Sequence, residues 1–104
     1  ISVLYNYGDE NQALKQIWDK MPQVANTETE LSQAISLDDF YPEDKDYYNF
    51  EGSLTTPPCT EGVNWIVFKN QETVSKEQVE KFTQTLGFEN NRPIQDTNGR
   101  QIKE

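Results

Sequence analysis

The length, charge and apolar content of the chain exclude several classes of protein. A length of 104 residues corresponds to one domain of ordinary size. The 9 basic and 18 acidic residues give a net charge of −9, which opposes binding to nucleic acid or to a membrane surface. The longest apolar run, Trp65–Phe68, is far shorter than the roughly 20 residues that span a bilayer. Apolar residues make up only 34% of the chain, a small supply for one autonomous core.

The N-terminal residues predict a strand. Apolar and polar side chains alternate over residues 1–7, and Gly8 ends the pattern. The chain begins inside this stretch, without an initiator Met or a signal sequence, so we expect the start to be a cut in a longer protein.

A helix and a long loop are expected next. Asp9 and Gln12 have the spacing of a helix cap. Apolar residues then recur at helical spacing, and Pro22 ends the helix; these residues are Leu14, Ile17, Trp18 and Met21. Residues 23–46 are mostly polar and predict a loop that holds one weak strand or turn.

The second half of the chain predicts two strands, a helix and a polar tail. We expect a strand over residues 47–50 that Gly52 ends, a loop over residues 54–58, and a strand over residues 63–68 that is covered on both faces. Ser75 and Gln78 form a capping-box pattern ahead of an amphipathic helix that Gly87 ends. Weak strand character returns at Ile94 and Ile102. This order predicts a mainly β, α+β fold with a mostly antiparallel sheet and peripheral helices.

The residue inventory excludes several kinds of active site. The chain has no histidine, one cysteine and no glycine-rich phosphate loop, so it holds neither a histidine-based triad nor a histidine zinc site. The carboxylate pairs Asp38-Asp39 and Glu43-Asp44 lie in polar sequence and are interpreted as exposed loop charge.

The segment 52–59 is the most unusual part of the sequence. It reads Gly-Ser-Leu-Thr-Thr-Pro-Pro-Cys and places three hydroxyl groups beside two prolines. A threonine hydroxyl that donates its one proton to a carboxylate must accept a hydrogen bond on its other side, so it selects a donor partner. Proline restricts the backbone around it, which lowers the entropy cost of holding these hydroxyls in place. Taken alone, the string is also typical of linkers and edge loops.

The residues around this segment resemble the signature of the α-carbonic anhydrases over positions 47–67, and the resemblance extends through almost the whole chain. The stretch 75–82 resembles a late helix of the family, 90–95 its Asn-x-Arg-Pro-x-Gln stretch, and 99–102 its C-terminal strand. Gly8–Asn11 and Ile17-Trp18 are similar to the helix before the signature in bacterial members. The resemblance implies that residues 1–104 are the C-terminal portion of a single α-carbonic anhydrase domain, and that they form part of its large, twisted, mostly antiparallel sheet.

The resemblance also implies roles for individual residues. Thr55 corresponds to the catalytic hydroxyl that orients the zinc-bound nucleophile toward carbon dioxide and donates to a glutamate expected upstream of residue 1. Thr56 corresponds to a position that contacts bicarbonate. The apolar wall for carbon dioxide would include Leu54, Val63 and Trp65, although the same residues also suit an ordinary core.

Two departures from the family and one further correspondence follow from the same resemblance. The zinc-binding histidines of the family are expected before residue 1 and are absent here, so no residue of this chain is predicted to bind metal. Phe50 stands where many relatives carry a tyrosine. Cys59 corresponds to one half of a disulfide with an upstream cysteine, which implies a periplasmic or secreted protein.

We therefore expect the complete protein to be a zinc-dependent carbonic anhydrase that converts carbon dioxide to bicarbonate and a proton. The chain alone is predicted to be inactive and to fold poorly, because its partner is the missing N-terminal part of the same domain. The alternative is a carbonic-anhydrase-like binding module without zinc. A further alternative is an independent acidic domain whose similarity is accidental.

Overall fold

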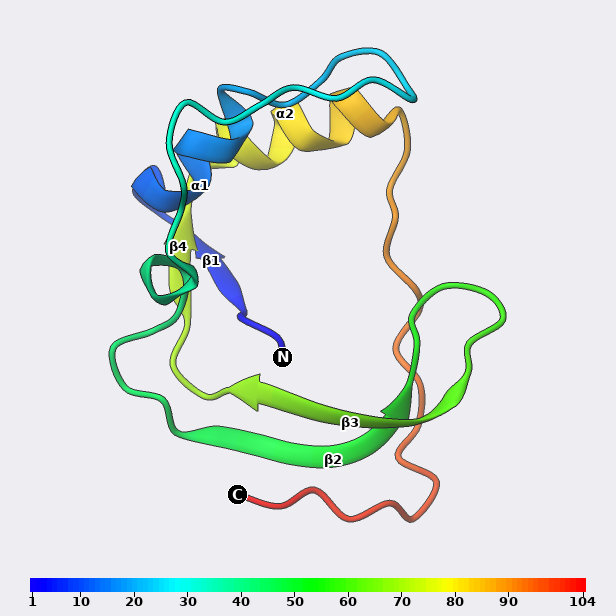
Figure 1. Ribbon diagram of the computed structural model, residues 1–104. Helices are drawn as coiled ribbons and strands as arrows, with labels where there is room; N and C mark the ends of the chain where they lie inside the picture. The colour runs from blue at the N-terminus through cyan, green and yellow to red at the C-terminus, as the bar shows by residue number, and fades with distance from the viewer. The chain divides into compact units, whose positions relative to one another are not determined.

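The computed structural model describes residues 1–104, which divide into two compact units. The sheet unit comprises Ile1–Leu4, Pro42–Gln71 and Asn90–Glu104. The helical unit comprises Tyr5–Tyr41 and Glu72–Glu89. Figure 1 shows the elements of both units along the chain.

The sheet unit is built on an antiparallel pair, β2 (Tyr47–Ser53) and β3 (Glu61–Phe68). Chain segments lie along both outer edges of this pair. Lys103 forms an antiparallel bridge to Asn49 of β2, and Ser2 forms a parallel bridge to Val67 of β3. The two ends of the chain therefore extend the sheet on either side.

The helical unit combines a short parallel pair with two helices. The strands are β1 (Tyr5–Tyr7) and β4 (Glu72–Val74), and the helices are α1 (Gln12–Trp18) and α2 (Lys76–Leu86). A 3-10 helix, η1 (Leu37–Phe40), lies against α1. No helix of the chain combines the length and the apolarity that crossing a membrane requires.

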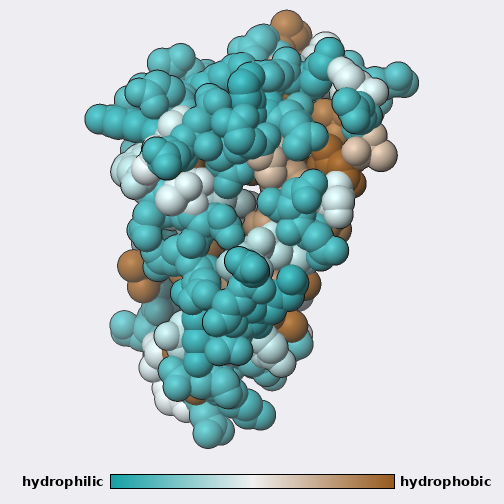
Figure 2. Space-filling model, turned by 90° about the vertical axis from the view of Figure 1, so that its left-hand side faces the viewer, coloured by the Kyte–Doolittle hydropathy of each residue, from teal (hydrophilic) through white to brown (hydrophobic).

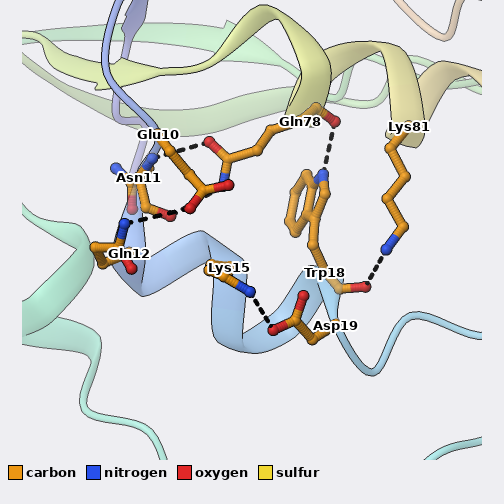
Figure 3. Close-up of polar contacts among 8 residues, drawn as sticks. All are labelled: Glu10, Asn11, Gln12, Lys15, Trp18, Asp19, Gln78 and Lys81. Atoms are coloured by element: carbon orange, nitrogen blue, oxygen red, sulfur yellow. Dashed lines mark hydrogen bonds and ion pairs between the residues drawn. The ribbon is translucent and has the colours of Figure 1, made fainter.

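One buried glutamine joins the two helices at their N-termini. Gln78 completes the predicted capping box with Ser75, and its side chain also accepts from the Asn11 backbone N–H and donates to the Asn11 carbonyl, both at 2.9 Å. The backbone carbonyl of Gln78 accepts from Nε1 of Trp18 at 2.7 Å, and the Trp18 ring stacks on the Phe82 ring. Figure 3 shows the bonds of Gln78 to Asn11 and Trp18, and the exposed Lys15–Asp19 pair. The hydrogen bond of that pair raises the pKa of Lys15 and lowers the pKa of Asp19.

The cap of α1 and its end differ from the sequence prediction. Asn11, and not Asp9, caps the helix, because the Asn11 side chain accepts from the Leu14 N–H while Gln78 holds the Asn11 backbone. The helix ends at Trp18 and not near Pro22. Tighter turns follow it, with i→i−3 hydrogen bonds from Lys20 and Met21.

The predicted end of β2 at Gly52 is also wrong. The irregularity at this point is a bulge in the opposite strand, β3. β2 continues through Gly52 to Ser53, and the register shifts there because Gly52 pairs with Val63 while Ser53 pairs with Glu61. Gly62 is the extra residue of this bulge, with a φ of 83° that favours glycine. Gly52 serves another purpose, because a Cβ there would lie 2.9 Å from Cδ1 of Trp65.

Other parts of the prediction agree more closely with the structure. Residues 23–46 form a long loop whose regular element is η1, and α2 ends at Gly87 as expected. The strand predicted near residues 63–68 is present, but its two faces are only half covered, since Phe68 alone is buried. Ile94 is fully exposed outside any strand.

The core of the chain is small. Phe68 and Val74 are the two buried hydrophobic residues, one in each unit. The chain exposes 8261 Å² of surface, whereas two separate globular proteins of half its mass would together expose about 7,200 Å². Figure 2 shows hydrophobic residues at the surface among hydrophilic ones. Much of the apolar surface is thus left without a covering layer.

Candidate functional site

The candidate site is the gate loop, residues 54–60, which connects β2 to β3 within the sheet unit. Two backbone hydrogen bonds close it: the Leu54 N–H donates to the Thr60 carbonyl at 2.9 Å, and the Cys59 N–H donates to the Thr56 carbonyl at 2.8 Å. Thr55 and Thr56 are exposed between these closures. The loop thus presents two neighbouring hydroxyl groups to solvent, and two hydrogen bonds across the loop hold its backbone.

The prolines and Cys59 shape the far side of the gate loop. The Pro57-Pro58 peptide bond is cis, and Cys59 follows it with a φ of 56°. Both prolines are exposed, whereas Cys59 is half-buried. Cys59 is a free thiol in this chain, which contains no second cysteine, so the predicted disulfide stays a prediction.

The predicted apolar wall is only partly assembled. Val63 and Trp65 lie two residues apart on β3, so they share one face of the sheet, and both are half-buried. The Trp65 ring stacks on Phe50 with centroids 6.5 Å apart. Leu54 is 43% exposed at the start of the gate loop. These three residues therefore lie at the stem of the loop and leave apolar surface open to solvent.

Trp65 has a polar role that the sequence does not reveal. Its Nε1–H donates to the Ser53 carbonyl at 3.0 Å, which fixes the last residue of β2 just before the gate loop. Because Gly52 has no side chain, the indole has room to lie against the strand. The residue is thus both an apolar surface and an anchor for the loop.

Two arginines of the C-terminal segment also bind the stem of the gate loop. Nη1 of Arg92 donates to Oγ of Ser53 at 3.0 Å, and Nη1 of Arg100 donates to the Glu51 carbonyl at 2.8 Å. Both arginines and Ser53 line a polar cavity of about 290 Å³. Sequence reasoning missed these contacts because they join residues 39 and 49 positions apart. The available signal was the Asn-x-Arg-Pro stretch, which contains Arg92.

The donor set of this chain does not fit a catalytic zinc ion. The chain has no histidine, and its cysteine and carboxylates form no group of three that could hold a metal. Catalytic zinc sites use three protein ligands, most often histidines. The gate loop can therefore supply hydroxyl groups and apolar surface, but not the metal ligands.

Comparison with known proteins places this geometry in a family. The family model described as eukaryotic-type carbonic anhydrase matches residues 1–104. The chain belongs to this carbonic anhydrase family. It is 45% identical over 104 residues to a carbonic anhydrase of Neisseria gonorrhoeae, of which it covers 41%. The carbonic anhydrase resemblance predicted from the sequence is confirmed.

Solved structures confirm the predicted fold class. The α-carbonic anhydrase of Thermovibrio ammonificans, solved with the inhibitor sulfanilamide, matches with a TM-score of 0.90 and 46% identity, over 96% of this chain and 44% of that one. Dioscorin, solved in complex with ascorbate, matches with a TM-score of 0.80 and 32% identity, over 96% of this chain and 44% of that one. The chain thus spans less than half the length of these relatives.

Proposed function

We propose that these 104 residues are the C-terminal part of a zinc-dependent carbonic anhydrase that hydrates carbon dioxide reversibly to bicarbonate and a proton. The carbonic anhydrase relatives support this proposal, and the chain corresponds to less than half of their length. The single observation that carries it is the gate loop, which presents Thr55 and Thr56 on a closed backbone within a whole-chain family match. The zinc ligands then belong to the part of the domain outside this chain.

The residues of this chain have defined tasks in the proposed reaction. When bound, zinc supplies a nucleophile at neutral pH by lowering the pKa of water. The Thr55 hydroxyl donates its proton to a carboxylate, so its lone pair accepts from the attacking group and orients it. Thr56 contacts bicarbonate. The open apolar surface of Leu54, Val63 and Trp65 receives carbon dioxide, a nonpolar substrate that needs an apolar slot beside its attacking group.

The remaining parts of the proposal concern the whole protein. The isolated chain is inactive because it lacks metal ligands, and its physical partner is the N-terminal part of the same domain. Cys59 pairs with a cysteine in that part, which suits a periplasmic or secreted protein. The half-buried free thiol and the open apolar surface are compatible with such a covering part.

A binding module without zinc is the second candidate, and one relative favours it. Dioscorin shares this fold and is described in a complex with ascorbate. Metal analysis of the purified complete protein separates the two candidates. One zinc ion per chain supports the enzyme, whereas a metal-free protein with no hydration activity supports the binding module.

Substitution of Thr55 in the complete protein tests the proposed mechanism. Thr55→Val keeps the shape but removes the orienting hydroxyl, so we expect kcat for carbon dioxide hydration to fall about 100-fold, the scale for loss of one preorganised hydrogen bond. Thr55→Ser restores most of the activity. Thr29→Val, in an exposed part of the long loop, is the matched control and leaves kcat unchanged. Full activity in Thr55→Val, with zinc still bound, contradicts the proposed role.

A further inference from the structure

Ser53 connects the C-terminal segment to the peptide that leads into Thr55. Its Oγ accepts from Nη1 of Arg92 at 3.0 Å and donates to the Leu54 carbonyl at 2.9 Å. A hydroxyl has one proton to donate and two lone pairs, so both bonds form at once. The charged guanidinium polarises the hydroxyl and strengthens the bond that the hydroxyl donates.

The orientation of the peptide between Leu54 and Thr55 depends on the hydrogen bond from Ser53. The Leu54 N–H is held by the Thr60 carbonyl at 2.9 Å, and the Leu54 carbonyl is held by Ser53. The first bond restrains the peptide plane before Leu54, and the second restrains the plane that leads into Thr55 through its carbonyl. On the other side, Pro57 restricts the backbone of Thr56. Thr55 therefore follows a peptide held through its carbonyl and precedes a residue with a restricted backbone, although its own side chain is exposed.

We propose that Arg92 is a positioning residue that orients the Thr55 hydroxyl through Ser53 and the Leu54 carbonyl. The proposal rests on the proposed function, because it assigns a second residue to the same site. Arg92 is half-buried and lines the polar cavity, whose lining includes none of Leu54, Val63 and Trp65. Its effect is one of geometry, and a misplacement of about 1 Å can cost about 100-fold in rate.

Arg100 offers a matched comparison within the same segment. It also donates to β2, at the Glu51 carbonyl, and its other guanidinium bonds go to the Thr97 and Asp96 carbonyls. None of these acceptors belongs to the gate loop. Loss of Arg100 should therefore loosen the C-terminal segment, whereas loss of Arg92 should loosen the loop.

Amide hydrogen exchange in the complete protein tests this without relying on catalysis. Arg92→Met keeps the length of the side chain and removes its donors. We expect exchange at the Leu54 and Cys59 amides to rise at least tenfold, with the β2–β3 ladder amides unchanged. Arg100→Met should instead accelerate exchange at its own amide, which donates to Thr97. Unchanged exchange at Leu54 and Cys59 in Arg92→Met, or equal acceleration along β2 and β3, overturns the proposal.

A double-mutant cycle with Ser53 gives the second readout. Ser53→Ala alone should lower kcat per bound zinc about tenfold, and Ser53→Ala with Arg92→Met should be no worse than Arg92→Met alone. Additive losses overturn the proposal. Ser53→Ala is the milder change and keeps the test decisive if Arg92→Met does not fold. If the complete protein hydrates no carbon dioxide, the proposed function fails, while the exchange result still decides the role of Arg92.

Discussion

Two glycines at the stem of the gate loop meet different physical demands. Gly62 has a positive φ and open space around it, so its requirement is conformational. Gly52 has no such φ, but its missing Cβ leaves room for Cδ1 of Trp65 at 2.9 Å and Nη1 of Arg100 at 3.3 Å. The sequence pattern alone marks Gly52 as a strand breaker. Only the cross-strand packing shows that Gly52 lies inside a continuous strand.

This difference predicts distinct effects of alanine at the two positions. Gly62→Ala in the complete protein should cost about 1 to 2 kcal/mol of unfolding free energy from backbone strain, with unchanged tryptophan fluorescence. Gly52→Ala must displace the Trp65 indole, so we expect a comparable or larger loss together with a shifted emission spectrum. Denaturant unfolding followed by fluorescence measures both. An unshifted spectrum in Gly52→Ala contradicts the packing described for Trp65.

The helices show how far local sequence signals reach. The capping box of Ser75 and Gln78 was predicted because both partners lie within four residues, and it is confirmed. The cap of α1 was assigned to Asp9, because nothing near it reveals that Gln78 binds the Asn11 backbone across 67 positions. In the same way, the Thr-Thr-Pro-Pro loop was found from the sequence, while the side chains that hold its stem were not. Local chemistry was predictable, but contacts between distant segments were not.

Gln78 is expected to stabilise both helices at once. Gln78→Ala removes the capping-box bond, leaves the Asn11 N–H without its partner, and leaves the Asn11 carbonyl with only its bond from the Lys15 N–H. We therefore expect a loss of about 2 kcal/mol or more in the complete protein. Gln84→Ala, at an exposed position of the same helix, is the control and should change stability by less than about 0.5 kcal/mol. Equal effects of the two substitutions in urea unfolding contradict the joint capping role.

The whole chain carries few of the features of an autonomous domain. Each of the two units buries a single hydrophobic residue. Large apolar side chains such as Leu37, Phe88 and Ile94 are more than 60% exposed. The fold class was predictable from the family signature, whereas the thin core could be suspected only from the 34% apolar content. How far the strand faces are covered depends on contacts between distant segments, so no local pattern could predict it.

The isolated chain should therefore unfold without a sharp cooperative transition. So little buried apolar surface offsets only a small part of the conformational entropy of 104 residues. We expect a broad loss of circular dichroism on heating and binding of a hydrophobic dye already at room temperature. The complete protein is the comparison and should show one steep transition. A steep transition with no dye binding in the isolated chain contradicts this expectation.

We propose that this chain supplies the orienting hydroxyl of a carbonic anhydrase and that the metal site lies elsewhere in the domain. Carbon dioxide hydration, measured with zinc supplied for the isolated 104 residues and for the complete protein, tests it most directly. We expect the uncatalysed rate for the isolated chain and zinc-dependent turnover for the complete protein. Zinc-dependent hydration by the isolated chain, or none by a zinc-supplied, folded complete protein, would contradict it.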